Sequence, residues 1–518
     1  MITRRPVFPF AVAIAIAAII PVMYCHPALA RNQVQLPAWM PGVLVQEAKF
    51  PAHQAVSNQA RSATTAKKNT KRNKAQEAQI TPATIGKYTV TPDGTGRLAT
   101  YSPDGVISTS SNSFFEALGT NQRTCFTCHQ LKDGWSVTPT DVQARYNASN
   151  GTDPIFRMID GATCPDDDVS TPEAMKQAFS LVLNKGLIRV FLPMPANTQF
   201  EIVAVDDPYN CNTKPSTGLT SPTTGIVSVY RRPLPSTGLR FNSAVLDDGR
   251  EPSLLSQARD AVMIHEQRSS IPGAGQMNQA VAFESEIDTA QAWDNTAGAL
   301  DQNGADGGAF AMAAKQFYLG MNDPFGNNPT GAPFHPEAFT MYVGWQQLSG
   351  TCAAKQARES IARGEKIFNR RVFDISGVAG LNNLVGNATI AGTCSTCHDT
   401  PAMGIHSVSL FMDSGVTDGP IIQRPSDLPL FTLKCIAGPL SGQTFQTTDP
   451  GRALITGQCA DIAKIKVPSL RGLAARAPYF QAGEAPTLQD VVNYYDQRFD
   501  LGLSSQDQQD LVNFLRTL

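Results

Sequence analysis

Short runs of β-branched and aromatic residues, separated by Pro and Gly clusters, predict strands in the first half of the chain. They occur at 187–191, 200–205 and 225–230, and runs of this composition and length are typical of β-strands. We therefore predict a small sheet or hairpins, inserted into an otherwise helical unit.

Elsewhere, hydrophobic positions recur at the spacing of an amphipathic helix. Leu254, Ala258 and Val262 share one face with His265, so a helix that begins after the N-cap Ser253 would point His265 inward. Further helical segments are predicted at 113–118, 140–146, 353–368, 487–499 and 505–518. The expected fold class is mainly α.

The hydrophobic run at 7–23 differs from these segments, because two arginines precede it and Ala28-Leu29-Ala30 follows it. This order predicts a signal peptide, 1–30, that is cleaved after Ala30, and hence a periplasmic protein. An uncleaved membrane anchor is the alternative. Because Pro9 and Pro21 interrupt a run that is too short to span a bilayer, we expect no stable membrane insertion.

Charge is unevenly distributed, although the formal net charge is only -2. Residues 31–80 hold eight Lys or Arg against two Glu, whereas 81–518 hold 32 basic residues against 42 acidic ones. With little periodicity, 31–84 is predicted to be a flexible basic tether, or alternatively a hook for an acidic partner or a membrane surface. The acidic body argues against a nucleic-acid partner.

Two five-residue patterns carry the chemistry. Each has two cysteines separated by two residues and followed by a histidine: Cys125, Cys128 and His129 in one copy, and Cys394, Cys397 and His398 in the other. This is the attachment pattern of c-type haem, in which the thiols add to the vinyl groups and the imidazole binds the iron. Two covalently bound haem c groups are therefore expected.

A leading helix and a haem pattern occur in both halves, which indicates two cytochrome c-like haem domains. Gly350-Thr351 is a plausible boundary between them. We predict one domain at 85–350, which includes the small β-hairpin insertions, and a second at 351–518.

The remaining cysteines suggest disulfides, because export leads to an oxidising compartment. Cleavage after Ala30 removes Cys25, and the simplest pairing of the rest is Cys164 with Cys211 and Cys435 with Cys459. Cys352 is then the odd thiol.

Motifs at 467–473, 477–483 and 487–492, together with the two haem patterns and the Asp-Gly-Arg helix start at 248–250, resemble the bacterial di-haem cytochrome c peroxidase and MauG family. The resemblance covers the chain from about residue 100 to the end. It implies a peroxidatic haem in 85–350 and an electron-transferring haem in 351–518. It also implies a calcium ion between the haems, bound partly through the backbone oxygens of Arg476 and Pro478.

Site residues follow from this resemblance position by position. His129 and His398 match the proximal iron ligands, and Tyr495 falls on the position of the second axial ligand of the C-terminal haem. The alternatives are His406 as the competing ligand and a packing role for Tyr479 or Tyr494 near this site.

The catalytic Gln of the family matches Gln257, but the catalytic Glu position falls on Gln267. His265 or Glu266 would then supply the acid/base group, with a buried core histidine as the alternative for His265. No His or Met lies between His129 and Met158, so the sixth position of the first haem is predicted to be open.

Three further features depart from the family pattern or invite a metal. Asp247 replaces the Trp that relays electrons between the haems, and Gln481 stands where the family has His. Possible substitutes for the missing Trp are more often ordinary core residues: Trp135, Trp293 and Trp345. The acidic run at 166–168 could bind calcium, although a solvated turn is the simpler interpretation.

The function that follows is periplasmic reduction of hydrogen peroxide at the N-terminal haem, with electrons passed through the C-terminal haem from a small donor cytochrome or cupredoxin. A second interpretation is MauG-like oxidation, or oxygenation with dioxygen, of an organic or protein substrate; the wider family includes oxygenases that cleave polyisoprene. The third is a di-haem electron carrier without catalytic activity.

Overall fold

The computed structural model describes residues 45–47, 81–214, 225–418 and 425–518. The predicted signal peptide, 1–30, and most of the predicted tether, 31–84, lie outside these residues. Within the tether, β1 (Val45–Glu47) pairs in parallel with β3 (Tyr88–Pro92). The assignment of 31–84 as a flexible basic tether stays a prediction.

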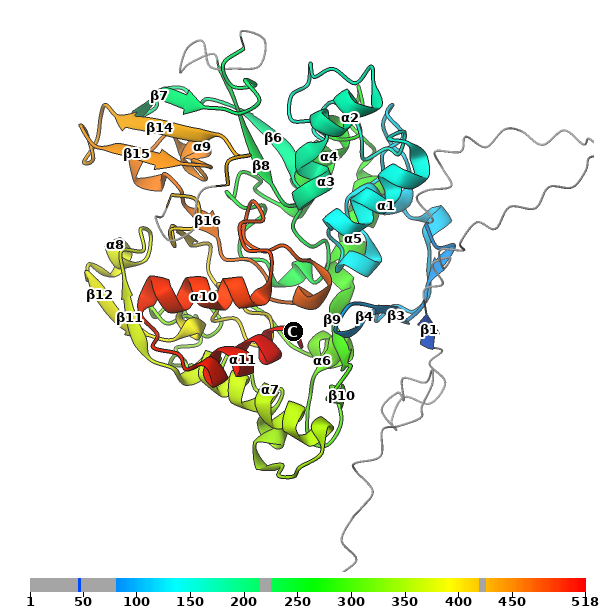
Figure 1. The fold of residues 1–518 in the computed structure, drawn as a ribbon, viewed down its shortest axis with the longest axis vertical. Helices are drawn as coiled ribbons and strands as arrows, with labels where there is room; N and C mark the ends of the chain where they lie inside the picture. Colours follow the sequence, from blue (N-terminus) through cyan, green and yellow to red (C-terminus); the bar gives the residue numbers. More distant parts are fainter. Residues whose placement is uncertain (1–44, 48–80, 215–224, 419–424) are drawn as a thin grey trace, which may run out of the picture.

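A five-stranded sheet, which the sequence analysis did not predict, forms part of the N-terminal half (Figure 1). Its order is β1-β3-β4-β9-β10, and the pairs after β1 are antiparallel. Helix α6 packs against it through Ala309 and Met312. The remaining elements of this layer are β4 (Gly96–Tyr101), β9 (Asp288–Asp294), β10 (Gly298–Ala299) and α6 (Gly308–Ala313).

Helices surround the first Cys-x-x-Cys-His segment. The Oγ atom of Ser253 accepts a hydrogen bond from Ser256 N, which confirms it as the N-cap of α4. The predicted helix at 113–118 is only a 3-10 turn, Ser113–Phe115. The helices of this half are α1 (Pro139–Ser149), α2 (Pro172–Ala178), α3 (Ser180–Lys185), α4 (Leu254–Ile264) and α5 (Ala274–Glu286), and a short pair of strands is β2 (Thr84–Ile85) with β5 (Ile107–Ser108).

The three predicted strands are present as β6 (Ile188–Pro193), β7 (Phe200–Asp206) and β8 (Ile226–Arg231). Strands β6 and β8 form an antiparallel pair. Strand β7 instead pairs with β14 (Leu430–Cys435), which also pairs with β15 (Thr444–Thr447). The prediction that all three strands form a local insertion is wrong, because β7 completes a sheet with the C-terminal half.

In the C-terminal half, the three predicted helices are confirmed as α7 (Ala353–Arg370), α10 (Leu488–Phe499) and α11 (Ser505–Leu515). Helix α7 lies close against α11 (Figure 1), because Gly364 has no side chain: a Cβ atom there would lie 2.0 Å from Asp510 O. The shorter elements are α8 (Asn382–Val385), α9 (Ala453–Thr456), β11 (Phe373–Ser376), β12 (Thr389–Gly392), β13 (Phe411–Met412) and β16 (Ile465–Lys466).

The hydrophobic core crosses the predicted domain boundary at residue 350. Its buried members include Phe339, Tyr342 and Trp345 from one side and Ile361, Phe368 and Phe514 from the other. The two halves are thus packed against each other, and their division into 85–350 and 351–518 stays a prediction.

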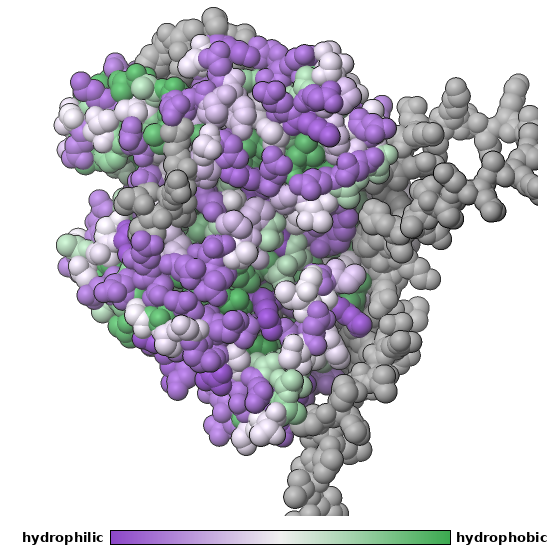
Figure 2. Space-filling view, viewed as in Figure 1, coloured by the Kyte–Doolittle hydropathy of each residue, from purple (hydrophilic) through white to green (hydrophobic). Residues whose placement is uncertain are grey.

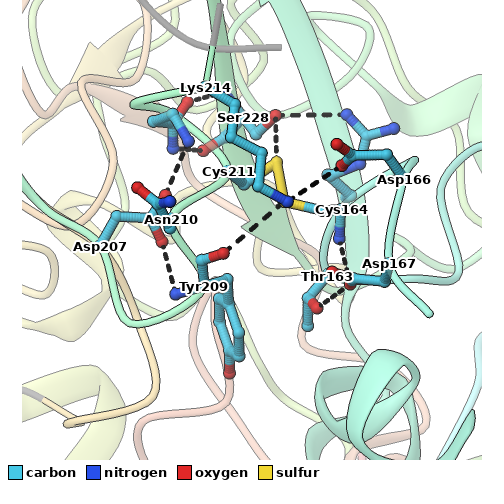
Figure 3. The surroundings of a disulfide bond; sticks show 12 residues. Thr163, Cys164, Asp166, Asp167, Asp207, Tyr209, Asn210, Cys211, Lys214 and Ser228 are labelled. Carbon is cyan, nitrogen blue, oxygen red and sulfur yellow. Dashed lines mark hydrogen bonds and ion pairs between the residues drawn. A yellow bond between two sulfur atoms is a disulfide. The ribbon is translucent and has the colours of Figure 1, made fainter. Parts of the chain in front are cut away.

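Both predicted disulfides are present. Cys164 pairs with Cys211 and Cys435 with Cys459, with Cα atoms 5.4 and 6.0 Å apart. Around the first, Asp167 accepts hydrogen bonds from Thr163 Oγ1 and Cys164 N, as Figure 3 shows. The prediction that Cys352 is an unpaired thiol is wrong, because Cys352 is disulfide-bonded.

The acidic run at 166–168 forms a turn whose charges are already engaged. Asp166 pairs with Lys214 at 3.2 Å (Figure 3), and Asp168 accepts a hydrogen bond from Ser170 N. With Asp167 bound to its own turn, the three carboxylates do not converge on one point. This arrangement agrees with a solvated turn.

One face of the molecule is mainly hydrophilic, with small separate hydrophobic areas (Figure 2). Among the described residues, no helix combines the length and the apolar character that crossing a membrane requires.

Candidate di-haem site

The first Cys-x-x-Cys-His segment borders a large cavity, which we call the first cavity. Cys125 begins a 3-10 turn that ends at Thr127. Thr124, the residue before this turn, forms a capping box with Thr127. Both thiols, Cys125 and Cys128, are free and line the cavity together with His129. The cavity is partly open to solvent.

The second segment borders another cavity, which we call the second cavity. Its free thiols, Cys394 and Cys397, line this space with His398, and Cys394 likewise begins a 3-10 turn with a capping box. Apolar side chains from α10, α11 and β11 complete the lining, among them Val492, Leu511 and Ile375.

The two histidines are held in the same way. His129 Nδ1 donates a hydrogen bond to Trp135 O at 3.0 Å, and His398 Nδ1 donates to Gly404 O at 2.5 Å. In each case the acceptor is a carbonyl six residues downstream, so Nε2 is the nitrogen left for iron. Burial lowers the pKa of both histidines to about 4, which keeps the rings neutral and able to bind a metal at pH 7.

Two free thiols, a neutral imidazole with one nitrogen fixed, and a large adjoining cavity are what covalent haem attachment requires. The residues of both segments therefore fit a haem c group. They provide the attachment atoms and the proximal ligand without any rearrangement of the hydrogen bonds described above.

The structure brings the three predicted catalytic residues to the first cavity: Gln257, His265 and Glu266 all line it. Gln257 comes from α4, whereas His265 and Glu266 follow its last turn. What these residues have in common is that they line the same cavity. Their catalytic roles remain predictions.

His265 is oriented by a hydrogen bond to Asp160. Its Nδ1 lies 2.5 Å from Asp160 Oδ2, and Arg123 binds the other oxygen of the same carboxylate. Although burial alone would raise it, these two partners lower the pKa of Asp160 to about 2. With Nδ1 engaged, Nε2 is the nitrogen of His265 that is available to the first cavity.

Glu266 is the buried carboxylate at this position. Burial raises its pKa to about 7, and Oε2 accepts hydrogen bonds from Leu118 N and Gly119 N. Gln267, on which the family's Glu position falls, is exposed, has a left-handed backbone (φ 56°) and does not line the cavity. An offset of one residue therefore separates the motif position from the carboxylate that reaches the first cavity.

Sequence reasoning missed a second carboxylate, Glu284 on α5. It lines the first cavity, is 5% exposed, and has a pKa that burial raises to about 8. No sequence motif distinguishes Glu284 from the other residues of α5. Its position on the buried face of the helix, with Met277 and Ala280, was the available signal.

At the second cavity, Tyr495 is one of two tyrosines in the lining, with Tyr479. The hydroxyls of the neighbouring tyrosines are engaged: Tyr479 donates to Leu473 O and Tyr494 donates to Ser414 O, both at 2.8 Å. Tyr495 makes no such hydrogen bond to a described residue. Burial and the nearby thiols of Cys394 and Cys397 raise its pKa.

His406, the competing ligand, does not line the second cavity and lies between Asp399 and Asp323. The lining does contain Met412 of β13, a thioether that the sequence analysis did not consider. Apart from the attachment segment itself and Tyr479, whose hydroxyl is bound to Leu473 O, Tyr495 and Met412 are side chains of this lining with an atom of the kind that binds haem iron.

One wall separates the two cavities. The residues that line both are Arg232, Pro233, Leu234, Asp247, Lys466, Pro468 and Ser469. The position of the family's relay Trp therefore does lie between the cavities, but a carboxylate occupies it. Burial raises the pKa of Asp247 and lowers that of Lys466 to about 8, while each charge stabilises the other.

None of the three proposed substitutes for the relay Trp lines either cavity. Trp135 is buried and donates to Thr100 Oγ1, Trp293 lies on β9 beneath Arg97, and Trp345 stacks on Tyr342. All three are packing residues in this structure.

Arg232 occupies the place where a calcium ion would be expected. Its guanidinium donates to Arg476 O at 2.9 Å, to Val137 O at 3.0 Å and to Lys185 O at 2.7 Å. Burial lowers the pKa of Arg232 to about 10, so it stays charged at pH 7. The carbonyl of Arg476 thus faces a cationic side chain, and the residues here do not fit a calcium ion.

A buried ion-pair network includes residues of two sequence motifs, the Asp-Gly-Arg helix start at 248–250 and the segment at 477–483. Arg231 pairs with Asp248 at 2.6 Å and with Asp449 at 2.8 Å. Gln481 donates to the same Asp449, so the residue in place of the family's His joins this network. Gly249, in its left-handed conformation (φ 67°), gives Phe411 room: a Cβ atom would lie 2.3 Å from its ring.

Sequence comparisons agree with this arrangement. A cytochrome-c peroxidase, IdrP2 of Denitromonas iodatirespirans, is 30% identical over 135 residues, which are 24% of this chain and 36% of the relative. Cytochrome c551 peroxidase of Nitrosomonas europaea is 23% identical over 251 residues, 47% of this chain and 66% of the relative. Over these segments the chain is similar to cytochrome c peroxidases.

The similarity to these peroxidases is partial. A third relative, cytochrome-c peroxidase IdrP1 of Pseudomonas sp. (strain SCT), is 26% identical over 35% of this chain and 49% of its own length. The chain thus spans between about a third and two thirds of the length of these three peroxidases. No protein-family profile matches the chain.

Among solved structures, a MauG-like protein associated with microbial copper homeostasis aligns with 56% of this chain and 76% of its own. The sequence identity is 14% and the TM-score is 0.29.

Proposed function

We propose that the protein is a periplasmic di-haem c oxidoreductase that reduces hydrogen peroxide in the first cavity, with electrons that enter at the second. The observation that carries the proposal is the first cavity itself, where Cys125, Cys128 and His129 share one lining with Gln257 and the buried carboxylate of Glu266.

Cys125, Cys128 and His129 would hold one haem, and Cys394, Cys397 and His398 the other. When bound, these groups supply the one-electron redox chemistry that peroxide reduction requires. The Nδ1 hydrogen bonds of both histidines keep Nε2 directed to the metal and fix the tautomer.

Peroxide cleavage needs a group that takes a proton from one oxygen and returns it to the other. Glu266 supplies this group: its pKa of about 7 places ionised and protonated forms within reach at neutral pH. The backbone amides of Leu118 and Gly119 hold one of its oxygens, so the carboxylate keeps one orientation. Gln257 donates a side-chain hydrogen bond to the peroxide, and His265, held by Asp160, supplies a second polar contact.

Electrons from a small cytochrome or cupredoxin would enter at the second cavity, where Tyr495 would help to hold the haem bound by His398. They reach the first cavity across the shared wall. Asp247 and Lys466 line both cavities, and Lys466 N donates a hydrogen bond to Asp247 O at 2.7 Å where the family has an aromatic relay. Because the two cavities share this wall, electrons would pass from the second cavity to the first without crossing another domain.

Peroxide consumption by the purified holoprotein, with a reduced small cytochrome c as donor, tests the proposal. The wild type should turn over, whereas Glu266→Gln should lose about 10²–10⁴-fold in kcat. Glu286→Gln is the matched control, because Glu286 is an exposed residue at the end of α5. Oxidation of the donor that is equally fast in both variants would contradict the role of Glu266.

A second function, electron transfer without catalysis, has one observation in its favour. His265 lines the first cavity with Nε2 available, and it would close the sixth iron position if it bound there. A holoprotein that exchanges electrons rapidly with the donor, but shows no oxidation of the donor that depends on peroxide, would support this carrier function.

A further inference from the structure

Asp323, Asp399 and His406 form a buried cluster away from both cavities. Asp323 belongs to the loop after α6, Asp399 follows the proximal His398, and His406 lies seven positions further along. Their exposed fractions are 2%, 0% and 1%. The cluster therefore joins a loop of the N-terminal half to the segment that carries the second haem pattern.

Several strong ligand atoms in this cluster have no hydrogen-bond partner. Asp323 Oδ2 accepts from Phe325 N, Asn327 N and Asn327 Nδ2, but Asp323 Oδ1 is buried and unsatisfied. Both nitrogens of His406 are also buried without a hydrogen bond. Buried polar atoms in native proteins are almost always satisfied, so this concentration requires an explanation.

The geometry directs these atoms toward one another. His406 Nε2 lies 3.8 Å from Asp323 Oδ1, and His406 Nδ1 lies 3.2 Å from Asp399 Oδ2. Asp399 is itself fixed, because Ser407 N and Ser407 Oγ donate to its two oxygens at 2.7 and 2.9 Å. Among the described residues, neither carboxylate makes an ion pair with a lysine or an arginine.

Two buried carboxylates without a basic partner are costly unless a cation compensates them. We propose that a divalent transition-metal ion of the zinc type binds between Asp323 Oδ1 and His406 Nε2. Asp399 would be a positioning residue, because its Oδ2 lies 3.2 Å from His406 Nδ1. This carboxylate–histidine–metal order is common at protein metal sites.

The ligand types and spacing fit such an ion. Zinc binds imidazole nitrogen and carboxylate oxygen at about 2.0–2.2 Å, so two of its ligand atoms lie at most about 4.3 Å apart. The observed 3.8 Å satisfies this limit. Calcium prefers six to eight oxygen ligands, which the nitrogen-containing cluster does not offer. The ion would clamp the Asp323 loop onto the segment after His398.

Metal analysis of the full-length, tag-free holoprotein tests the proposal. After equilibration with chelator-buffered zinc and desalting, mass spectrometry should find about one zinc per chain in addition to the haem iron. Asp323→Asn and His406→Gln should abolish this zinc. Asp399→Asn should weaken it about 10–100-fold, as expected for a residue that orients a metal ligand.

The matched control is His335→Gln, because His335 is an exposed histidine of the same loop region and lies outside the cluster. It should retain the full zinc content, and the haem absorption of every variant verifies folding. Zinc should also raise the Tm of the wild type and of His335→Gln, but not that of Asp323→Asn. A wild type that retains no more zinc than Asp323→Asn would overturn the proposal.

Discussion

His129 Nδ1 donates to Trp135 O at 3.0 Å, and this one hydrogen bond ties the first haem pattern to the N-terminal core. Trp135 is fully buried among Phe114, Phe126 and Phe283. The carbonyl that orients the imidazole is therefore immobile. A proximal ligand held in this way presents Nε2 in a constant direction, as an iron-binding histidine requires.

Glu266→Gln should change the pH dependence of peroxide reduction as well as its rate. A carboxylate that accepts a proton from peroxide must be ionised in the free enzyme, so kcat/KM of the wild type should rise as pH increases through about 7, the pKa of Glu266. Rates measured between pH 5 and 9 with a reduced cytochrome should show this rise. It should be absent from the residual activity of Glu266→Gln, and an unchanged rise would assign it to another group.

Glu284→Gln should stabilise the protein selectively at high pH. Burial raises the pKa of Glu284 to about 8, above the value of an unfolded glutamate, so the folded state binds more protons. The free energy of unfolding therefore falls as pH rises from about 4.5 to 8. The variant lacks this loss, and its advantage should be on the order of 3 kcal/mol larger at pH 8 than at pH 5. Equal Tm differences at the two pH values would contradict this.

Tyr495→Phe should alter the absorption spectrum and lower the stability of the oxidised form of the haem at His398. A tyrosinate ligand favours the ferric state relative to a thioether, so the midpoint potential should rise if Met412 or water replaces it. Tyr494→Phe is the matched control, since the Tyr494 hydroxyl is bound to Ser414 O. If the spectrum of Tyr495→Phe, like that of Tyr494→Phe, matched the spectrum of the wild type, Tyr495 would be excluded as the ligand.

The two segments that line the cavities with free thiols and a histidine could be recognised from the sequence because their residues are local. Cys125, Cys128 and His129 stand within five positions, and so do their counterparts at 394–398. The same holds for the Ser253 cap of α4, where Oγ and the amide of Ser256 are three residues apart. Local chemistry of this kind depends little on the rest of the fold.

Residues brought together over long distances could not be predicted in this way. Strand β7 pairs with β14 more than two hundred residues later, and Lys466 meets Asp247 only after β16 has paired with β13. Strand β9, with the sequence DTAQAWD, has few β-branched residues, so its composition hides a central strand. Glu284 illustrates the same limit, because only the cavity distinguishes it from other buried helix positions.

Arg232→Gln should destabilise the protein, because in the wild type Arg232, and not a calcium ion, satisfies the carbonyls at this position. The guanidinium satisfies the carbonyls of Val137, Lys185 and Arg476, and leaving these unpaired should cost about 2–4 kcal/mol. Thermal unfolding of the holoprotein should therefore occur at a lower Tm. Arg259→Gln, at an exposed position on α4, should have no such effect.

Calcium itself provides the complementary measurement. Since Arg232 already faces the Arg476 carbonyl, millimolar calcium should change neither the Tm nor the peroxide turnover of the wild type. An increase in either would show that a calcium ion binds elsewhere or displaces Arg232.

The central claim is that the haem held by His129 has an open site that reacts with peroxide. Rapid-mixing absorption spectroscopy of the holoprotein, before and after reduction of the haem at His398, tests it most directly. We predict a spectral response to stoichiometric peroxide in the half-reduced protein, followed by oxidation of added reduced cytochrome. A first haem that stays six-coordinate and low-spin in every redox state, with no response to peroxide, would contradict the account.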